Sequence, residues 1–242
     1  MSRWYRRVAI LAGGLLAAAP VVIAGELPST ARPLRYALQV EPELSSLAFK
    51  GRVVVTIDVL RPTLTLTMHA ADLHFGLVEL SRATGNPTVM RPIIETRARE
   101  QTATLRFEAP LASGRYRLDM QYRGRIGREP SGVFALEDSS PLALRRALCT
   151  RLKPSKARTL LPLWDEPAYS AEFVVTVIVA SSEAASSNGR VAARRPLEDD
   201  RAEIRFEPVL HLQPDALFLT AGAPAQLCTR EGAAVPTAAQ RR

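Results

Sequence analysis

One stretch decides the fold class: Gly51-Arg52-Val53-Val54-Val55-Thr56-Ile57-Asp58-Val59. Its apolar side chains at 53, 55, 57 and 59 recur at every second position, which places them on one face of an extended strand. The same alternation marks four further runs, at residues 36–40, 64–68, 116–122 and 173–179. β-Branched residues dominate these runs and suit a pleated surface. The sequence therefore predicts a succession of half-buried β-strands.

Turn-forming residues separate these strands. Ser113-Gly114 precedes one of them, Pro130-Ser131-Gly132 follows it, and Ser186-Ser187-Asn188-Gly189 lies between two late strands. With 18 prolines spread along the chain, only residues 141–149 remain as a candidate for a short helix. Many short strands divided by turns predict an all-β domain, built as an antiparallel β-sandwich or a barrel-like assembly.

The composition is that of a soluble globular protein. Of the 242 residues, 47% are hydrophobic and 23% charged, which is ordinary for this class and excludes disordered and collagen-like chains. The formal net charge of +8 invites a nucleic-acid interpretation. The cations are scattered among acidic residues, however, and only Arg145–Arg146 and the group Arg151, Lys153, Lys156 and Arg158 are clustered. We therefore expect no nucleic-acid binding.

The N-terminus has the layout of a secretory signal peptide. Arg3, Arg6 and Arg7 precede an uncharged apolar run over residues 8–19, and Val22-Ile23-Ala24 forms an A-x-A-like cleavage site. The run reaches only the lower edge of a membrane-spanning length, and Pro20 interrupts it, although an uncleaved anchor stays an alternative. We expect residues 1–24 to be removed, leaving an exported, periplasmic or secreted protein without a membrane span.

The remaining chain is expected to form one β-domain over residues 25–228. A polar tail rich in small residues follows over residues 229–242 and is expected to be mobile. Export would place Cys149 and Cys228 in an oxidising compartment, where two cysteines can form a disulfide. Their separation excludes a zinc-ribbon or C-x-x-C site, but it leaves open whether they are bonded.

The first half of the domain carries an ordered set of motifs. Pro33-Leu34-Arg35-Tyr36-Ala37-Leu38 comes first, then Phe49-Lys50-Gly51, then Leu64-Thr65-Leu66-Thr67-Met68-His69-Ala70-Ala71-Asp72-Leu73. This order resembles the opening of the M1-family zinc aminopeptidases. That opening has a P-x-x-Y-x-L strand, an F-x-G strand and an L-x-L-H-A-x-x-L strand.

A second block strengthens the resemblance. Thr150-Arg151-Leu152-Lys153-Pro154 leads to Ala157-Arg158, and Pro162-Leu163-Trp164-Asp165-Glu166-Pro167 leads to Ala171-Glu172-Phe173. The family pattern here is T-Q-x-E-P-x-x-A-R, followed by P-x-x-D-E-P-x-x-x-A-x-F. The resemblance covers residues 27–227 and implies the saddle-like β-domain that precedes the thermolysin-like catalytic domain in the family.

The catalytic chemistry of the family is missing from these residues. The resemblance implies hydrolysis of N-terminal residues by a zinc-activated water, with HExxH supplying two ligands and the general base. The three histidines, His69, His74 and His211, are not followed by Glu and have no HExxH spacing, and the G-A-M-E-N motif is also absent. We therefore expect no catalytic residue, no metal site and no cofactor here. Zinc would enter only with a separate catalytic domain.

The substrate-binding contribution of the β-domain is also altered. In the family, the Gln and Glu of T-Q-x-E accept hydrogen bonds from the free α-ammonium of the substrate. Arg151 and Lys153 occupy those positions here, and both are cationic donors that repel an ammonium group. The resemblance therefore implies a degenerate amine anchor. The two side chains could instead bind a carboxylate or another anion, or form a solvated edge.

The prolines and carboxylates of the second block favour a structural interpretation. Pro162 and Pro167 fix φ and stiffen the link into the following strand. Asp165 and Glu166 can cap backbone N–H groups or pair with Arg158. Adjacent carboxylates rarely converge on one substrate atom, so general acid–base catalysis is the weaker hypothesis.

Three functions follow from different classes. The first is a non-catalytic aminopeptidase β-domain, left by a truncated gene or by loss of the catalytic domain. The second is an exported binding module that kept the fold. The third is one half of a split enzyme, completed in trans by a metallopeptidase chain. The first and third functions predict an apolar face that is uncovered in this chain alone, because such a domain normally packs against a catalytic partner.

Overall fold

The computed structural model describes residues 26–84, 88–140, 143–222 and 228. Its largest sheet has eight strands in the order β12-β13-β10-β1-β2-β7-β4, with β14 also paired to β10. These strands are β1 (Ala31–Glu43), β2 (Ala48–Val59), β4 (His74–Arg82), β7 (Gly114–Arg125), β10 (Ala171–Ala180), β12 (Val191–Pro196), β13 (Arg201–Phe206) and β14 (Val209–Leu212). Strands β1 and β10 run parallel, and the other neighbours in this sheet run antiparallel.

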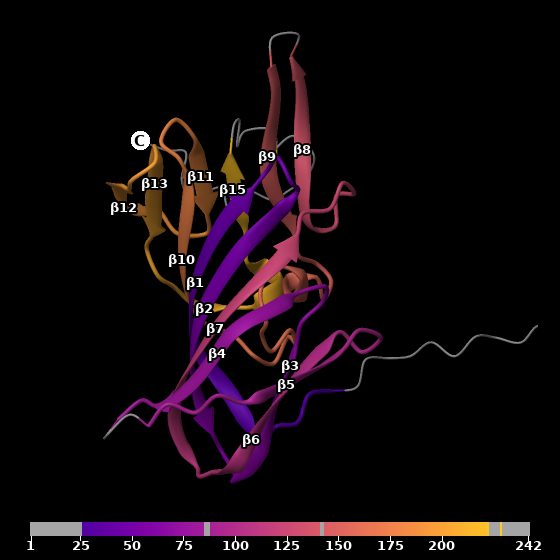
Figure 1. The fold of residues 1–242 in the computed structure, drawn as a ribbon, viewed down its shortest axis with the longest axis vertical. Helices are drawn as coiled ribbons and strands as arrows, with labels where there is room; N and C mark the ends of the chain where they lie inside the picture. Colours follow the sequence, from indigo (N-terminus) through magenta and orange to yellow (C-terminus); the bar gives the residue numbers. More distant parts are fainter. Residues whose placement is uncertain (1–25, 85–87, 141–142, 223–227, 229–242) are drawn as a thin grey trace, which may run out of the picture.

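Two smaller sheets lie toward opposite ends of the long axis (Figure 1). The four-stranded sheet has the order β11-β15-β9-β8 and consists of β8 (Gly132–Ser140), β9 (Ala143–Arg151), β11 (Ala184–Ser187) and β15 (Leu219–Gly222). The three-stranded sheet has the order β3-β6-β5 and consists of β3 (Thr63–His69), β5 (Ile93–Arg97) and β6 (Thr102–Leu111). Two short 3-10 helices, η1 (Ala157–Thr159) and η2 (Pro214–Ala216), complete the described elements. The prediction of an all-β domain of antiparallel sheets is confirmed.

The expected short helix over residues 141–149 is wrong. Ala143–Arg151 is strand β9, which pairs with β8 in a regular antiparallel register that places Phe134 opposite Cys149. Ala147, Leu148 and Cys149 are all buried, so both faces of the strand are covered and a one-faced helix would not fit. Packing across the two strands overrode a weak local preference.

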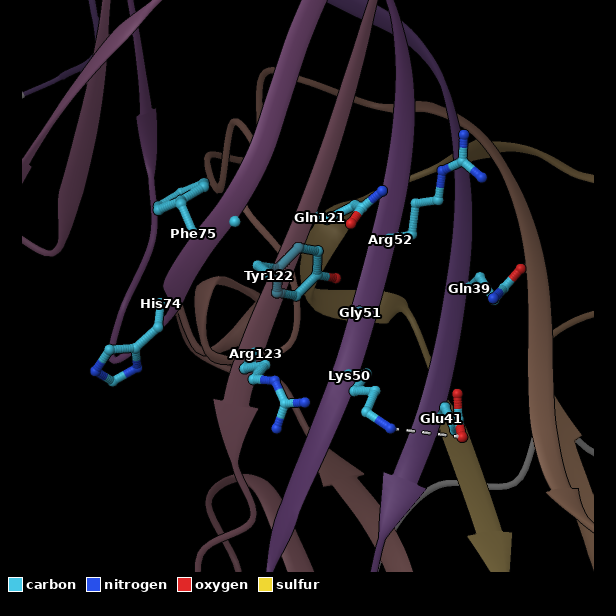
Figure 2. Close-up of a pocket in the computed structure, with 11 residues that line it drawn as sticks. Gln39, Glu41, Lys50, Gly51, Arg52, His74, Phe75, Gln121, Tyr122 and Arg123 are labelled. Atoms are coloured by element: carbon cyan, nitrogen blue, oxygen red, sulfur yellow. Dashed lines mark ion pairs between the residues drawn. The ribbon is translucent and has the colours of Figure 1, made fainter.

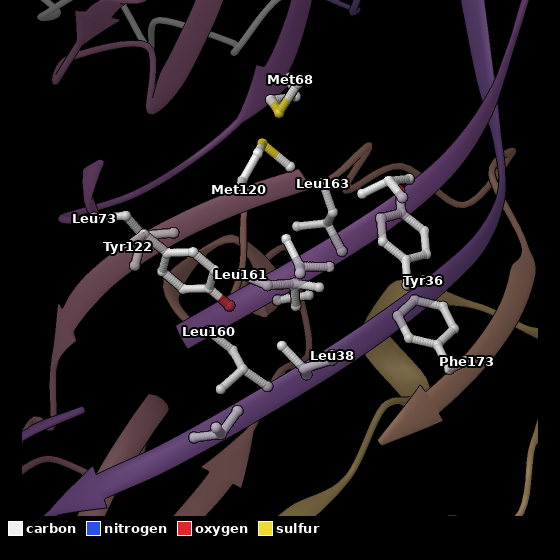
Figure 3. Packing of buried hydrophobic residues seen from close by; sticks show 14 of the residues in the cluster. Tyr36, Leu38, Met68, Leu73, Met120, Tyr122, Leu160, Leu161, Leu163 and Phe173 are labelled. Carbon is white, nitrogen blue, oxygen red and sulfur yellow. The ribbon is translucent and has the colours of Figure 1, made fainter. Parts of the chain in front are cut away.

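The core fills the space between the sheets. Tyr36 of β1 stacks on Phe173 of β10 with 4.7 Å between ring centroids, as the neighbouring rings in Figure 3 show. Leu160, Leu161 and Leu163 follow η1, are fully buried, and pack among side chains of β1 and β7. The alternating residues 53, 55, 57 and 59 all point into this core, as the sequence predicts.

Two glycines allow aromatic rings to lie flat on the inner face of the large sheet. Gly51 stands opposite Tyr122, and Gly124 stands opposite Phe49. A Cβ atom at either glycine would overlap the facing ring. The two rings meet edge to face with centroids 6.3 Å apart. Each glycine therefore provides the space that an aromatic side chain on the neighbouring strand fills.

A disulfide answers the question that the sequence left open. Cys149 and Cys228 are bonded, with their Cα atoms 5.6 Å apart. The bond lies in a small second core that also contains Phe134 and Phe218, so residue 228 is fixed against the four-stranded sheet. The predicted signal peptide and tail, residues 1–24 and 229–242, lie outside the described residues, and the domain bounds stay predictions. In the described part of the chain, no helix is long and apolar enough to span a membrane.

Candidate functional site

A buried ion pair holds the second sequence block together. The Arg158 side chain, which begins at η1, donates from Nε to Asp165 Oδ2 at 2.8 Å, and its Nη2 donates to the Asp165 main-chain oxygen at 3.3 Å. The backbone N–H of Arg158 donates to the same carboxylate oxygen at 3.3 Å. Both side chains are almost fully buried. Pairing with Arg158 is one of the two arrangements expected for Asp165 from the sequence.

His69 lies beside this pair at the end of β3. Its Nδ1 accepts the backbone N–H of Asp165 at 3.3 Å, and its main chain exchanges hydrogen bonds with Leu163. Burial, together with the nearby Arg158 guanidinium, lowers the pKa of His69 from 6.5 to about 4. A neutral His69 is therefore a hydrogen-bonded part of the core, because its acceptor nitrogen must stay unprotonated.

Glu166 makes a separate contact. Its Oε1 accepts the backbone N–H of Leu27 at 2.8 Å and so ties the N-terminal end of the described chain to the block. Between the two prolines, the backbone N–H of Trp164 donates to the hydroxyl of Tyr36 at 3.2 Å. Pro162 is buried, whereas Pro167 is exposed. The carboxylates of Asp165 and Glu166 thus serve different partners, and neither contact is of the kind that acid–base catalysis needs.

Arg151 and Lys153 lie where β9 ends. Arg151 is half-buried and stands opposite Gly132 of β8, while Lys153 is exposed and joined to Pro154 by a cis peptide bond. Pro154 and Ser155, the residues that follow Lys153, line a small hollow of about 90 Å³. It is lined by Pro154, Ser155, Asp165, Glu166, Pro167, Pro214 and Asp215. The fold thus brings the second block close to the segment that follows Lys153, while Arg151 and Lys153 themselves stay outside the lining.

The histidines do not form a metal site. His69 ends β3, His74 begins β4, and His211 lies in β14. Across the residues that the structure describes, no group of three or more His, Cys, Asp or Glu side chains could hold a metal ion. The donor set that the family's zinc requires is therefore not met by these side chains.

Comparison with known proteins identifies the ancestry. The profile described as Peptidase M1 N-terminal domain matches residues 32–211. This chain belongs to the M1 peptidase N-terminal domain family. The resemblance read from the Tyr36, Gly51 and Asp165 motifs is thereby confirmed.

The relatives are aminopeptidases that the chain matches in part. It is 30% identical over 200 residues to Aminopeptidase N of Acetobacter pasteurianus, which is 82% of this chain and 55% of that protein. It is 30% identical over 166 residues to Aminopeptidase M1-C of Oryza sativa subsp. japonica, which is 69% of this chain and 18% of that protein. A match of 30% over 154 residues to Endoplasmic reticulum aminopeptidase 1 of Mus musculus covers 62% of this chain and 17% of that protein. The chain thus spans about half of the bacterial relative and less than a fifth of the other two.

Sequence reasoning missed a feature of the exposed face of the large sheet. Two adjoining hollows, of about 510 and 360 Å³, share Gln39 and Arg52. Figure 2 shows Gln39 on β1, Arg52 on β2 and Gln121 on β7, which are neighbouring strands. Lys50 and Arg123 lie further along β2 and β7. The signal was present in β7, where Arg115, Arg117, Arg123 and Arg125 occupy four of the six outward positions. The buried, apolar positions of β7 identify the strand, whereas its outward arginines are the residues that mark this basic face.

Proposed function

We propose that this chain, once residues 1–24 are removed, acts as an exported β-domain of aminopeptidase N type that is not catalytic by itself. The observation that carries this proposal is the pair of cationic residues at the family's amine-anchor positions. Lys153 is exposed at the end of β9, and Arg151 is the last residue of that strand. Two positive charges disfavour a substrate ammonium group, whereas an aminopeptidase must attract one.

The anchor can be tested without a catalytic domain. Titration of the ¹⁵N-labelled chain with leucinamide, which presents a free α-ammonium, should leave the amide signals of residues 150–155 unchanged. Acetyl-leucinamide, which lacks the charge, is the matched control ligand. Saturable shifts at residues 150–155 with leucinamide alone would contradict the loss of the anchor.

Export is supported by two features that do not depend on each other. Residues 1–24 carry the signal-peptide pattern, and Cys149 and Cys228 are bonded, which is typical of proteins outside the reducing cytosol. Expression of the full chain in a Gram-negative host should give a periplasmic protein that begins at Gly25, by fractionation and N-terminal mass spectrometry. A cytoplasmic product that retains Met1 would contradict export.

The partner in this proposal is a separate catalytic metallopeptidase chain. Its support is the family membership of residues 32–211. Two exposed apolar side chains of the three-stranded sheet, Leu64 and Ile93, are 46% and 66% exposed and offer apolar surface to such a partner. Mixing with an M1 catalytic domain deprived of its own β-domain should give a complex in size-exclusion chromatography. Two separate peaks at all concentrations would contradict the partner.

A further inference from the structure

The exposed face of the large sheet has more cations than its carboxylates can neutralise. Asp119 contacts two arginines at once, Arg52 at 2.8 Å and Arg117 at 3.0 Å. The guanidinium groups beside Asp119 hold the pKa of its carboxyl below the usual range, so this carboxylate is ionised at neutral pH. One negative charge is thus shared between two positive ones, which leaves a positive excess at this position.

Two further carboxylates of the same face are shared in the same way. Asp58 pairs with Arg115 at 3.0 Å and with Arg32 at 3.3 Å. Glu43 pairs with Lys50 at 2.9 Å and lies 4.0 Å from Arg123. Lys50 also lies 3.9 Å from Glu41, which pairs in turn with Arg201 at 3.0 Å, so these two carboxylates face three cations. The excess of positive charge therefore recurs along β2 and β7.

Arg205 adds a cation without any partner. It lies on β13, is exposed, and lines the smaller of the two hollows. Its side chain has no ion pair or hydrogen bond with any residue in the part of the chain that the structure describes. Its guanidinium therefore keeps its full hydrogen-bonding capacity for a ligand.

The register of the sheet aligns polar side chains into one row across five strands. Arg205 stands opposite Thr176, Thr176 opposite Gln39, Gln39 opposite Arg52, and Arg52 opposite Gln121. Neighbouring strands lie about 4.8 Å apart, so the row offers a donor at each regular step. All five residues line the two hollows, and we call this row the cross-strand furrow.

We propose that the cross-strand furrow binds a linear anionic polysaccharide. The Arg205 guanidinium can bind a carboxylate or sulfate group with paired hydrogen bonds. Nε and Nη2 of Arg52 already donate to Asp119, which leaves Nη1 of Arg52 for a single contact. The amides of Gln39 and Gln121 and the hydroxyl of Thr176 suit sugar hydroxyls. Half-buried Phe75 lies on β4 at the edge of the larger hollow and packs against the main core, so only the part of its ring that stays exposed can meet the apolar face of a sugar. A polysaccharide presents both anionic groups and hydroxyls at each repeat, as the row requires.

An acidic peptide fits the furrow less well. All five strands of the row are paired on both sides, so their main-chain groups are used in the sheet. Extended peptides that bind a sheet usually add to a free edge and gain main-chain hydrogen bonds there. A peptide lying across the face would have side-chain contacts alone.

The proposal goes beyond the proposed function and does not depend on it, because binding at this face involves neither the altered anchor nor export. The test is isothermal titration calorimetry of the full chain with an octamer of galacturonic acid at low ionic strength. We expect saturable binding that weakens as salt is added. A sulfated octamer in a second arm distinguishes sulfate esters from carboxylates as the anionic group, and tighter binding of either octamer supports the proposal.

Two variants test whether the polysaccharide binds at the cross-strand furrow. Arg205→Gln removes a cation that has no partner to disturb, and it should weaken binding about tenfold, as expected for one lost charge-assisted contact. Arg97→Gln is the matched control, because Arg97 lies on β5 in another sheet and is also exposed; its affinity should equal that of the unmodified chain. Circular dichroism verifies that both variants are folded.

Three results would overturn the proposal. The first is an absence of binding to both anionic octamers. The second is binding of a glutamate octamer as tight as that of the galacturonate octamer, which would show a response to charge alone. The third is equal weakening by Arg205→Gln and Arg97→Gln, which would place the binding outside the furrow.

Discussion

Arg158 and Asp165 form a buried ion pair at 2.8 Å that joins η1 to the link before β10. Their side chains are only 6% and 3% exposed, so neither charge can be hydrated if the other is removed. The pair also fixes the main chain at both ends, because the carboxylate accepts the Arg158 N–H and the guanidinium donates to the Asp165 oxygen. This relationship gives the D-E-P block a structural role that can be measured.

Replacing Asp165 by Asn should destabilise the domain strongly. The change leaves the Arg158 cation buried without a counter-charge, which costs about 3–5 kcal/mol. Urea unfolding followed by circular dichroism measures the loss. Arg97→Gln, which breaks an exposed pair with Glu100, should change stability by less than about 1 kcal/mol. A loss for Asp165→Asn as small as that of the control would contradict the structural role.

The buried His69 should make stability depend on pH. Its pKa is lowered from 6.5 to about 4, so the unfolded chain binds a proton at a higher pH than the folded chain does. Its contribution is therefore fully present above pH 6.5 and is lost as the pH falls toward 4, by at most about 3 kcal/mol. Urea unfolding at several pH values should show this decline, and His69→Gln should reduce it. The exposed His74→Gln variant is the control, and an unchanged slope in His69→Gln would contradict the argument.

The disulfide should stabilise the folded state substantially. It joins residues 79 positions apart. Constraint of the unfolded chain by a loop of that length stabilises a domain by up to about 4.5 kcal/mol, and disulfides typically contribute about 2–4 kcal/mol. The double variant Cys149→Ala/Cys228→Ala, which leaves no free thiol, should unfold at a lower urea concentration. The reduced form of the unmodified chain should behave similarly. A midpoint that is unchanged by both treatments would contradict the stabilising role of the bond.

Gly51 and Gly76 form a matched pair of glycines on β2 and β4. A Cβ at Gly51 would overlap the Tyr122 ring, whereas a Cβ at Gly76 would lie 3.5 Å from the main-chain oxygen of Gln121, which is an ordinary contact. Gly51→Ala should therefore cost about 1–3 kcal/mol, and Gly76→Ala should be close to neutral. Thermal unfolding of the two variants makes the comparison. Equal melting temperatures would mean that the Tyr122 ring moves aside without cost.

Much of the fold could be predicted from local patterns. The alternation at Val53, Val55, Ile57 and Val59 predicted strand β2 and its buried face, because the period of side chains in a strand is fixed by geometry. The order of the strands in the sheet could not be predicted in this way. The parallel pairing of β1 with β10 joins residues far apart in sequence, and no local signal specifies such a contact.

In the candidate site, too, contacts within one short segment could be predicted from the sequence, whereas contacts between distant segments could not. The sequence offered Arg158 as a partner of Asp165, since both lie in one short segment. The sequence did not indicate that the Glu166 carboxylate accepts the backbone N–H of Leu27, because the two residues are 139 positions apart in the chain. The furrow was missed for a related reason, because Arg205 and Arg52 are placed in one row by the register of the strands between them and not by a motif.

We predict that these residues carry no peptidase chemistry of their own. The most direct measurement is hydrolysis of leucine p-nitroanilide by the purified chain in the presence of Zn²⁺, with a zinc analysis after dialysis. We expect no release of p-nitroaniline above the protein-free blank and no zinc retained by the chain. Release that rises in proportion to the chain, persists through further purification and is abolished by a chelator would contradict it.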